Sequence, residues 1–337
     1  MLKQNDLKKI DKELMFEAYD KWAEISKNAY NSNPKILQFQ DIDNIVFVGM
    51  GGSGTLGDIF SSILSKTNIH VSVVKGYLLP KTVDKNTLVV FTSVSGNTIE
   101  TLSALKSAKK QECKSISFSS GGLMKKYCIK NNLEYKMIEK NHSPRASFTS
   151  YLYTMLKIFE DIIPIKKNEV SNSIMELKKL NKKISSYNLT EKNPALNLAN
   201  EITGIPLIYY PWGLQSAALR FKNSLQENTK THAIVEDVVE SSHNGIVAWE
   251  KKSQMSPILL RGYDDYIKTK DRWNIFKKYF DINQISYNEI FSIKGGILSK
   301  LVYLIYLLDY TSIYKAILSK TDPSPVKSID FIKSELK

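Results

Sequence analysis

The stretch from Leu88 to Thr101 reads LVVFTSVSGNTIET, and the rest of the chain can be interpreted outward from it. Its first four residues are leucine, valine and phenylalanine, a composition typical of a short buried strand. The apolar spacing of a helix begins at Glu100. Between the strand and the helix lies a loop of hydroxyl side chains with one glycine, made of Thr92, Ser93, Ser95, Gly96 and Thr98.

A strand, a hydroxyl-rich loop and a helix in this order predict an anion site. The free N–H groups at the start of the helix and the helix dipole point at the loop, and the hydroxyls supply further donors. No lysine stands where a P-loop needs one to reach a triphosphate, so the loop favours a single phosphate on a small molecule. The alternative interpretation is an N-capping loop that binds no ligand.

A second glycine-rich turn, GMGGSG at residues 49–54, directly follows a predicted strand. It satisfies the G-x-G-x-x-G pattern of dinucleotide-binding sites. Those sites also need an acidic residue at the end of the second strand to hold the ribose hydroxyls, but that strand ends here in Lys75. We therefore expect Gly51, Gly52 and Ser53 to bring the backbone close to a sugar or its phosphate.

Strands and helices alternate through both halves of the chain. The predicted strands of the first half are residues 45–48, 70–74, 88–91, 115–118 and 135–138, and those of the second half are 205–210, 232–235, 258–260 and 285–289. This order predicts two α/β domains, each a doubly wound parallel sheet with flanking helices and with ligands at the carboxyl ends of the strands. We assign residues 1–150, led by an amphipathic helix over residues 1–35, and residues 196–337 to these domains, and residues 151–195 to a helical connector.

The composition argues against several other classes of protein. The chain has 337 residues and a formal net charge of +13, but only four of its 47 basic residues are arginine and no basic block is interleaved with aromatics, so nucleic-acid binding is not expected. Four histidines and two cysteines lack metal-ligand spacing, so we expect no metal and no cofactor.

The location of the chain can be predicted from its cysteines and its apolar runs. Cys113 and Cys128 lie far apart, which is typical of a reducing compartment. The N-terminus carries charges where a signal peptide needs an apolar run. The longest apolar run, Leu301 to Leu308, is too short to span a bilayer and predicts a buried helix. We therefore expect a cytoplasmic protein without membrane contact.

Three residues have the chemistry of proton transfer next to a carbonyl. Arg145 follows Pro144 at the carboxyl edge of the first predicted sheet and is a candidate anion clamp. Glu227 closes a helix at the mouth of a strand, and His243 lies in a polar loop. A carboxylate base, an arginine and an imidazole beside a phosphate loop meet the needs of enediolate chemistry. His142 is a weaker candidate, and the other histidines are expected to be structural.

Several motifs occur together along nearly the whole chain. They are GMGGSG at 49–54, SVSGNT at 93–98, Pro144-Arg145, ENTK at 227–230, His243-Asn244 and DPSPV at 322–326. Together they resemble the bifunctional phosphoglucose/phosphomannose isomerases, which are built from two sugar isomerase (SIS) domains. The resemblance implies a homodimer and a metal-free isomerase that interconverts aldose and ketose 6-phosphates.

The same resemblance implies roles for individual residues. Ser53, Ser93, Ser95 and Thr98, with Gly52 beside them, would bind the substrate phosphate. Glu227 would be the base that moves a proton between C1 and C2, and Arg145 would stabilise the cis-enediolate. His243, supplied across the dimer interface, would assist ring opening, and Lys333 would join that step.

Other functions remain as alternatives. A SIS-type sensor would bind a sugar phosphate without converting it, although a sensor needs the serine loop and not the base. A dehydrogenase is disfavoured by Lys75 at the end of the second strand. The residues leave open whether glucose 6-phosphate, mannose 6-phosphate or both are converted to fructose 6-phosphate.

Overall fold

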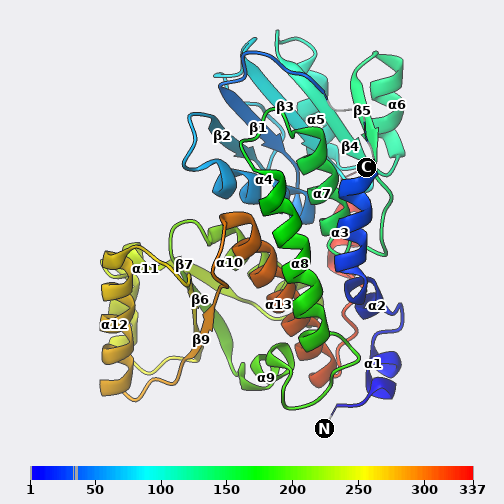
Figure 1. Ribbon diagram of the computed structural model, residues 1–337. Helices are drawn as coiled ribbons and strands as arrows, with labels where there is room; N and C mark the ends of the chain where they lie inside the picture. The colour runs from blue at the N-terminus through cyan, green and yellow to red at the C-terminus, as the bar shows by residue number, and fades with distance from the viewer. Residues whose placement is uncertain (1, 33, 35–36, 337) are drawn as a thin grey trace.

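The computed structural model describes residues 2–32, 34 and 37–336 and contains two parallel sheets, each covered by helices on both faces (Figure 1). The first sheet lies in the upper part of the view and the second at the lower left. Long helices, α8 (Lys167–Ile184) and α13 (Ile297–Leu318), run between them. The predicted fold class, two doubly wound α/β domains, is confirmed.

The first sheet has the strand order β2-β1-β3-β4-β5, and every neighbouring pair is parallel. Its strands are β1 (Asn44–Val48), β2 (His70–Val74), β3 (Thr87–Thr92), β4 (Lys114–Ser119) and β5 (Glu134–Met137). The chain leaves β1 toward one side of the sheet and β3 toward the other. A doubly wound sheet places its ligand crevice at such a switch point, here between the carboxyl ends of β1 and β3.

Alternating side chains of β1 bury both faces of this sheet. Phe47 stacks on Phe60 of α4, with ring centroids 4.9 Å apart. Val46 packs on the other face, in a core cluster that includes Leu102 and Leu105 of α5. The helices of this domain are α4 (Gly51–Leu64), α5 (Ile99–Ala108), α6 (Gly122–Lys130) and α7 (Phe148–Ile158).

The second sheet repeats the topology with one strand fewer, in the order β7-β6-β8-β9. Its strands are β6 (Ile205–Tyr210), β7 (Ile234–Asp237), β8 (Met255–Arg261) and β9 (Asn288–Phe291). One face carries α11 (Val238–Ser241), η2 (Gly245–Glu250) and α12 (Ile267–Ile282), and the other faces α9 (Pro194–Glu201), α10 (Gln215–Ser224) and α13.

Helix α13 is the central core element of the structure. It is long and apolar enough to cross a membrane, but 83% of its most apolar window is buried inside the protein. It packs against α8, α9 and α10. The predicted buried helix around Leu301 to Leu308 is therefore confirmed.

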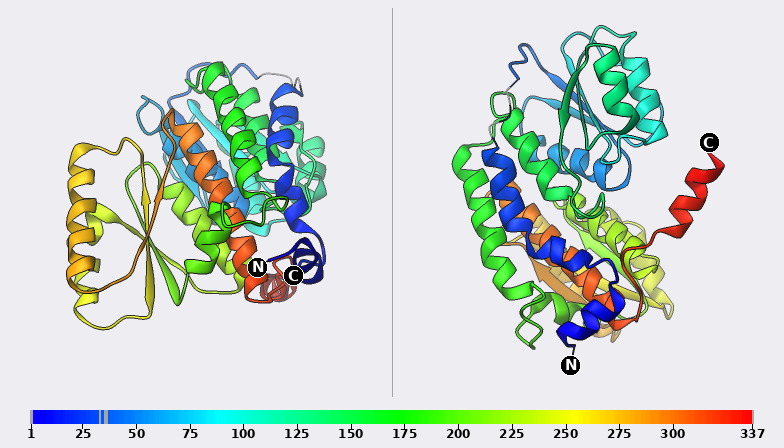
Figure 2. Two further views of the ribbon diagram at one scale, coloured as in Figure 1. Left: turned by 60° about the horizontal axis from the view of Figure 1, so that its bottom comes forward. Right: turned by 90° about the vertical axis from the view of Figure 1, so that its right-hand side faces the viewer.

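The N-terminal end of the chain differs from the prediction. The single helix expected over residues 1–35 is wrong, because the chain forms α1 (Gln4–Ile10), α2 (Met15–Asp20) and α3 (Trp22–Asn31). The break comes where Asp11 turns back to accept a hydrogen bond from Phe16 N and Leu14 adopts a positive φ of 55°. At the other end, α14 (Lys327–Glu335) projects from the body and has no buried residue (Figure 2).

Two strand starts in the second domain are also corrected. His232 does not begin a strand, because residues 231–233 are a connection and β7 starts at Ile234. The predicted strand from Ile285 starts three residues later, because the Ile285 N–H is still bound to the Phe280 carbonyl at the end of α12.

A buried ion pair joins α10 to α13. Arg220 Nη2 and Nε lie 2.6 and 3.0 Å from Asp309 Oδ2, and Ser224 Oγ donates to Asp309 Oδ1 at 2.7 Å. Both charged side chains are almost fully buried, at 2% and 0% exposure. The guanidinium also lies over the ring of Phe148 in α7, 4.4 Å from its centroid. The pair therefore links the second domain to the first.

Replacing Asp309 by alanine leaves Arg220 charged and without its carboxylate in the core. We predict a loss of about 3–5 kcal/mol in the free energy of unfolding, measured by urea titration. As a control, Glu176→Ala breaks an exposed pair with Lys179 and should cost less than about 1 kcal/mol. Similar small losses in the two variants would contradict the structural role of the buried pair.

Candidate active site

Two loops meet at the crevice between β1 and β3. The first runs from the end of β1 into α4, which starts at Gly51, and the second runs from β3 into α5, for which Thr98 is the N-cap. Both helices therefore direct their free N–H groups and positive dipole ends toward the loops. A phosphate bound here would be held by two helix starts, which neither loop supplies alone.

The hydroxyls of the two loops converge. Ser93 Oγ and Thr98 Oγ1 are 2.8 Å apart, and Ser53 Oγ accepts a 3.4 Å hydrogen bond from the N–H of Val94. Ser53 and Ser93 are buried, whereas Ser95 is exposed at the rim and accepts from Asn97 N at 3.2 Å. The structure thus brings Ser53, Ser93 and Thr98 together and places Ser95 at the edge of the group.

Two glycines allow neighbouring backbone segments to pack closely against each other in this region. Gly96 has a φ of 69°, and a Cβ there would lie 1.9 Å from the carbonyl oxygen of Gly121. Gly52 packs against the next segment, since a Cβ on it would lie 3.4 Å from Pro144 O and 3.6 Å from Arg145 Cα. Through Gly52 the phosphate loop lies directly beside the backbone of Arg145.

The guanidinium of Arg145 is held by four hydrogen bonds. Nε donates to Asn228 Oδ1 at 2.8 Å, and Nη1 donates to Glu227 Oε2 at 3.0 Å. Nη2 donates to the main-chain carbonyls of Pro323 and Ser324, at 2.7 and 3.0 Å. A guanidinium has five N–H donors, so a single Nη1 hydrogen, beside Glu227, has no partner among the described residues.

Glu227 lies in a π-helical turn, η1 (Leu225–Thr229), which continues α10. Such turns are rare inside helices and are frequent at functional sites. The adjacent Asn228 is fully buried and donates to Ser312 Oγ of α13 at 2.8 Å. The Glu227 side chain itself is 25% exposed, so its carboxylate is fixed on one side by Arg145 and open to a ligand on the other.

Lys230 closes the back of this turn. Its amine donates to the carbonyl of Glu227 and to the carbonyl of Pro325, the latter at 2.7 Å. Burial, and then the nearby charge of Arg145, lowers the pKa of the Lys230 amine. The amine therefore connects the main chain of the candidate base to the loop that receives Arg145.

His243 and Lys333 lie apart from this group. His243 is exposed in the turn after α11, a helix that packs against α12 on the outer side of the second sheet. Lys333 lies on the projecting α14 (Figure 2). Neither contacts Arg145 or Glu227 in the described part of the chain. The ring of His142, in contrast, is tied to the N-terminal segment, with Nε2 at 3.1 Å from the carbonyl oxygen of Glu13.

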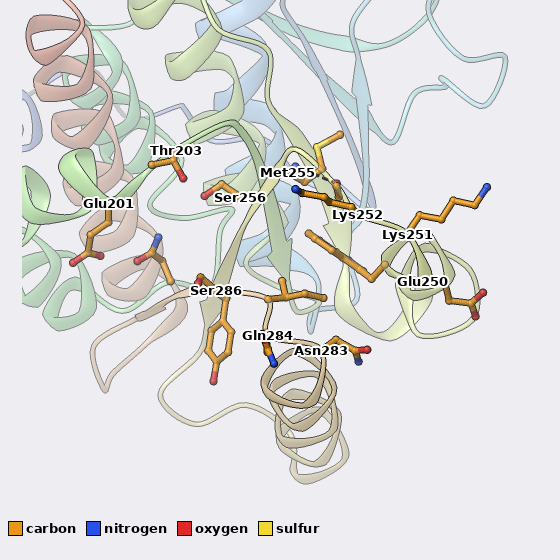
Figure 3. Close-up of a pocket in the computed structure, with 15 residues that line it drawn as sticks. Glu201, Thr203, Glu250, Lys251, Lys252, Met255, Ser256, Asn283, Gln284 and Ser286 are labelled. Carbon is orange, nitrogen blue, oxygen red and sulfur yellow. Dashed lines mark hydrogen bonds between the residues drawn. The ribbon is translucent and has the colours of Figure 1, made fainter.

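A separate hollow lies elsewhere on the surface. It has a volume of about 670 Å³ and opens at the amino ends of β8 and β9, where Met255 and Asn288 line it (Figure 3). Its polar lining includes Glu201, Lys251 and Lys252. Because ligands of doubly wound sheets bind at the carboxyl ends of the strands, this groove is not the candidate active site.

Comparison with known proteins agrees with this geometry. Residues 38–156 match the SIS domain family, and residues 191–336 match the family described as bacterial phospho-glucose isomerase C-terminal SIS domain. A bifunctional phosphoglucose/phosphomannose isomerase from Caldicellulosiruptor bescii is 32% identical over 96% of this chain and 98% of its own length. The chain belongs to the bifunctional phosphoglucose/phosphomannose isomerase family. The expected aldose–ketose isomerase is thereby confirmed at the level of the family, and a non-catalytic sensor is not favoured.

Other similar proteins include one that is named for a different reaction. A bifunctional phosphoglucose/phosphomannose isomerase from Aquifex aeolicus is 31% identical over 87% of this chain and 90% of its own. A D-glucosamine-6-phosphate 4-epimerase from Sulfolobus acidocaldarius is 28% identical over 73% of this chain and 77% of its own. Similar chains therefore carry names for more than one reaction of sugar phosphates.

Solved structures share the fold at low sequence identity. A hypothetical protein from Thermus thermophilus superposes with a TM-score of 0.74 at 13% identity, covering 95% of this chain and 89% of its own. The C-terminal domain of glucosamine-fructose-6-phosphate aminotransferase from Francisella tularensis gives 0.69 at 17% identity, covering 92% and 98%. At this level of sequence identity, these similarities concern the fold alone.

Sequence reasoning missed the groups that hold Arg145 in place. Asn228 stands inside the recognised ENTK motif, but the sequence assigned it no role. The carbonyls of Pro323 and Ser324 lie in the DPSPV motif, yet a main-chain acceptor leaves no side-chain signal. Arg220, whose Nη2 donates to the carbonyl of Arg145 at 2.7 Å, could have been suspected because arginine is rare in this chain.

Proposed function

We propose that this isomerase interconverts glucose 6-phosphate, mannose 6-phosphate or both with fructose 6-phosphate through a cis-enediolate. One observation carries the proposal: the carboxylate of Glu227 and a free Nη1 hydrogen of Arg145 lie side by side, next to a loop built for a phosphate. A base beside a fixed cation is what proton transfer next to a carbonyl requires. The reaction connects hexose phosphates used in glycolysis and gluconeogenesis.

The phosphate end of the substrate binds first in this account. Ser53, Ser93 and Thr98 donate hydroxyl hydrogens to it, Ser95 contacts it from the rim, and Gly52 allows the backbone to approach. The starts of α4 and α5 add N–H donors and positive dipole ends. Because this anchor is remote from the reacting carbons, its binding energy serves to place C1 and C2 beside Glu227.

The isomerisation then needs one proton carrier. The Glu227 carboxylate takes the proton from C2 of the open-chain aldose, and the electron pair of that bond moves into a C1–C2 double bond. The former carbonyl oxygen gains the negative charge and accepts a hydrogen bond from the free Nη1–H of Arg145. Glu227 returns the proton to C1 while the C2 oxygen becomes the ketose carbonyl, with the hydroxyl proton passing between the two oxygens, so no proton is gained or lost overall.

The planar enediolate explains how one site can serve two aldoses. C2 loses its configuration when its proton leaves, and glucose and mannose 6-phosphates differ only at that carbon. Return of the proton to one face or the other of C2 gives one or the other aldose. The ratio of products therefore depends on how the site holds the C2 hydroxyl.

We also propose a homodimer in which His243 of one subunit completes the site of the other. Support comes from exposed apolar side chains at the carboxyl ends of the strands of the second sheet: Trp212 after β6, Val239 after β7, Tyr263 and Tyr266 after β8, and Phe291 at the end of β9. Exposed apolar side chains gathered at one edge of a sheet are typical of a protein interface. His243 lies among them in sequence, and ring opening by His243 and Lys333 would precede proton transfer.

The protein is proposed to act in the cytoplasm, without metal, cofactor, membrane or nucleic acid. Cys113 and Cys128 are free thiols, as in a reducing compartment. In the described part of the chain, no cluster of three or more His, Cys, Asp or Glu side chains is placed to hold a metal ion. Independence from metal stays a prediction that EDTA tests directly.

Purified protein should convert fructose 6-phosphate in the presence of EDTA, and Glu227→Gln should lower kcat by at least about 100-fold, since it removes the general base. Glucose 6-phosphate and mannose 6-phosphate are measured separately by coupled assay. Glu201→Gln, a carboxylate in the distant groove, serves as the matched control and should keep wild-type activity. Binding of fructose 6-phosphate without turnover would contradict the isomerase and favour the sensor.

The shared site can be tested with doubly tagged heterodimers. Pairing a Glu227→Gln subunit with a His243→Ala subunit leaves one complete site out of two, so we predict about half the wild-type activity per dimer. Pairing a subunit that carries both changes with a wild-type subunit damages both sites and should give little activity. The opposite ranking, or a monomeric protein, would contradict a site shared across the interface.

A further inference from the structure

A buried carboxylate in the N-terminal segment reaches toward the active site. Asp11 has no exposed surface. Its Oδ2 accepts a 3.0 Å hydrogen bond from Phe16 N, and its Oδ1 accepts a 3.2 Å hydrogen bond from Ser324 Oγ. Burial raises the pKa of this carboxyl, and the Phe16, Met15 and Ser324 hydrogen bonds oppose that rise. A carboxylate is costly to bury, and here each of its oxygens accepts a hydrogen bond.

Ser324, which binds Asp11, is one of the two residues whose carbonyls accept hydrogen bonds from Arg145. The carbonyls of Pro323 and Ser324 accept both hydrogens of Arg145 Nη2. Lys230 holds the same loop from its other side through Pro325. The Ser324 hydroxyl is thus the point at which the N-terminal segment fixes the loop, and the two carbonyls are the points at which the loop fixes the guanidinium.

The same N-terminal segment also holds the loop that delivers Arg145. Trp22 Nε1 donates to the carbonyl of Ala146 at 2.9 Å, directly after the arginine. The carbonyl of Glu13 contacts His142 Nε2 at 3.1 Å, three residues before it. One short stretch, residues 11–22, therefore contacts both the loop that carries Arg145 and the segment that accepts hydrogen bonds from its side chain.

We propose that Asp11, acting through Ser324, is a positioning residue for Arg145. The inference rests on the proposed function. By binding the Ser324 hydroxyl, Asp11 fixes the segment whose two carbonyls set the plane of the guanidinium. That plane directs the remaining Nη1 hydrogen toward the oxygen that becomes charged in the enediolate. Negative charge is greatest there in the transition state, so a small rotation of the plane lowers kcat more than it weakens binding of the ground-state sugar.

The hydroxyl of Ser324 gives the cleanest test. Ser324→Ala should lower kcat on fructose 6-phosphate by about 5- to 50-fold, with KM within about twofold, because small misplacements of catalytic groups cost this much in rate. Ser324→Thr keeps the hydroxyl and should restore most of kcat. Asp11→Asn should lower kcat in the wild-type background and have no further effect in the Ser324→Ala background.

A matched control separates positioning from general stability. Ser186 Oγ donates to Asp20 Oδ2 at 2.7 Å from a serine that is also buried. This second Ser–Asp link likewise ties the N-terminal helices to the body, but it touches neither Arg145 nor its acceptors. Ser186→Ala should lower Tm by an amount similar to Ser324→Ala and leave kcat unchanged. All assays are run well below the lowest Tm of the series.

The outcomes are distinct. Wild-type kinetics in Ser324→Ala, or an equal loss of kcat in Ser186→Ala, would overturn the positioning role while leaving the isomerase intact. A loss of kcat in Ser324→Ala that Ser324→Thr fails to reverse would also overturn it, since the hydroxyl would not be the group that matters. An inactive wild-type protein would overturn the proposed function itself, and with it any role in that reaction.

Discussion

The buried pair between Arg220 and Asp309 is the interaction on which the active site depends. Removing either charge leaves the other unpaired in the core, which costs far more than breaking a surface pair. Besides Asp309, Arg220 Nη2 binds the main-chain carbonyl of Arg145 at 2.7 Å. The second domain therefore binds the first domain at Arg145, the residue whose side chain is proposed to stabilise the enediolate.

The same helix that carries Arg220 also carries the proposed base. Glu227 lies seven residues further along α10 and its π-helical continuation, about two turns away. Asn228 then binds Arg145 Nε on one side and Ser312 of α13 on the other. The positions of the proposed base and of Arg145 are therefore set by contacts with α10 and α13, whereas the proposed phosphate site is formed by loops of the first sheet. His243 and Lys333, the residues proposed to open the sugar ring, lie on exposed or projecting segments.

Much of this could be predicted from sequence, for a physical reason. Buried parallel strands are continuous apolar runs, so the predicted strands at residues 88–91 and 205–210 are found in β3 and β6. The hydroxyl loops follow the carboxyl ends of β1 and β3, as the topology requires. Features that depend on long-range contacts could not be found in this way. The helix break at Asp11 depends partly on Ser324, which lies more than three hundred residues away, and the π turn at Glu227 is set by packing on α13. The acceptors of Arg145 Nη2 are main-chain carbonyls, which any residue supplies.

In the proposed complex, one substrate bridges the phosphate loop and the Arg145–Glu227 pair. A crystal structure with a five-carbon sugar acid phosphate, whose carboxylate imitates the enediolate, tests it most directly. We predict that the phosphate lies against Ser53, Ser93 and Thr98, and that one carboxylate oxygen lies within hydrogen-bond distance of Arg145 Nη1 beside Glu227. A phosphate bound away from these hydroxyls, or a carboxylate that does not reach Arg145, would contradict it.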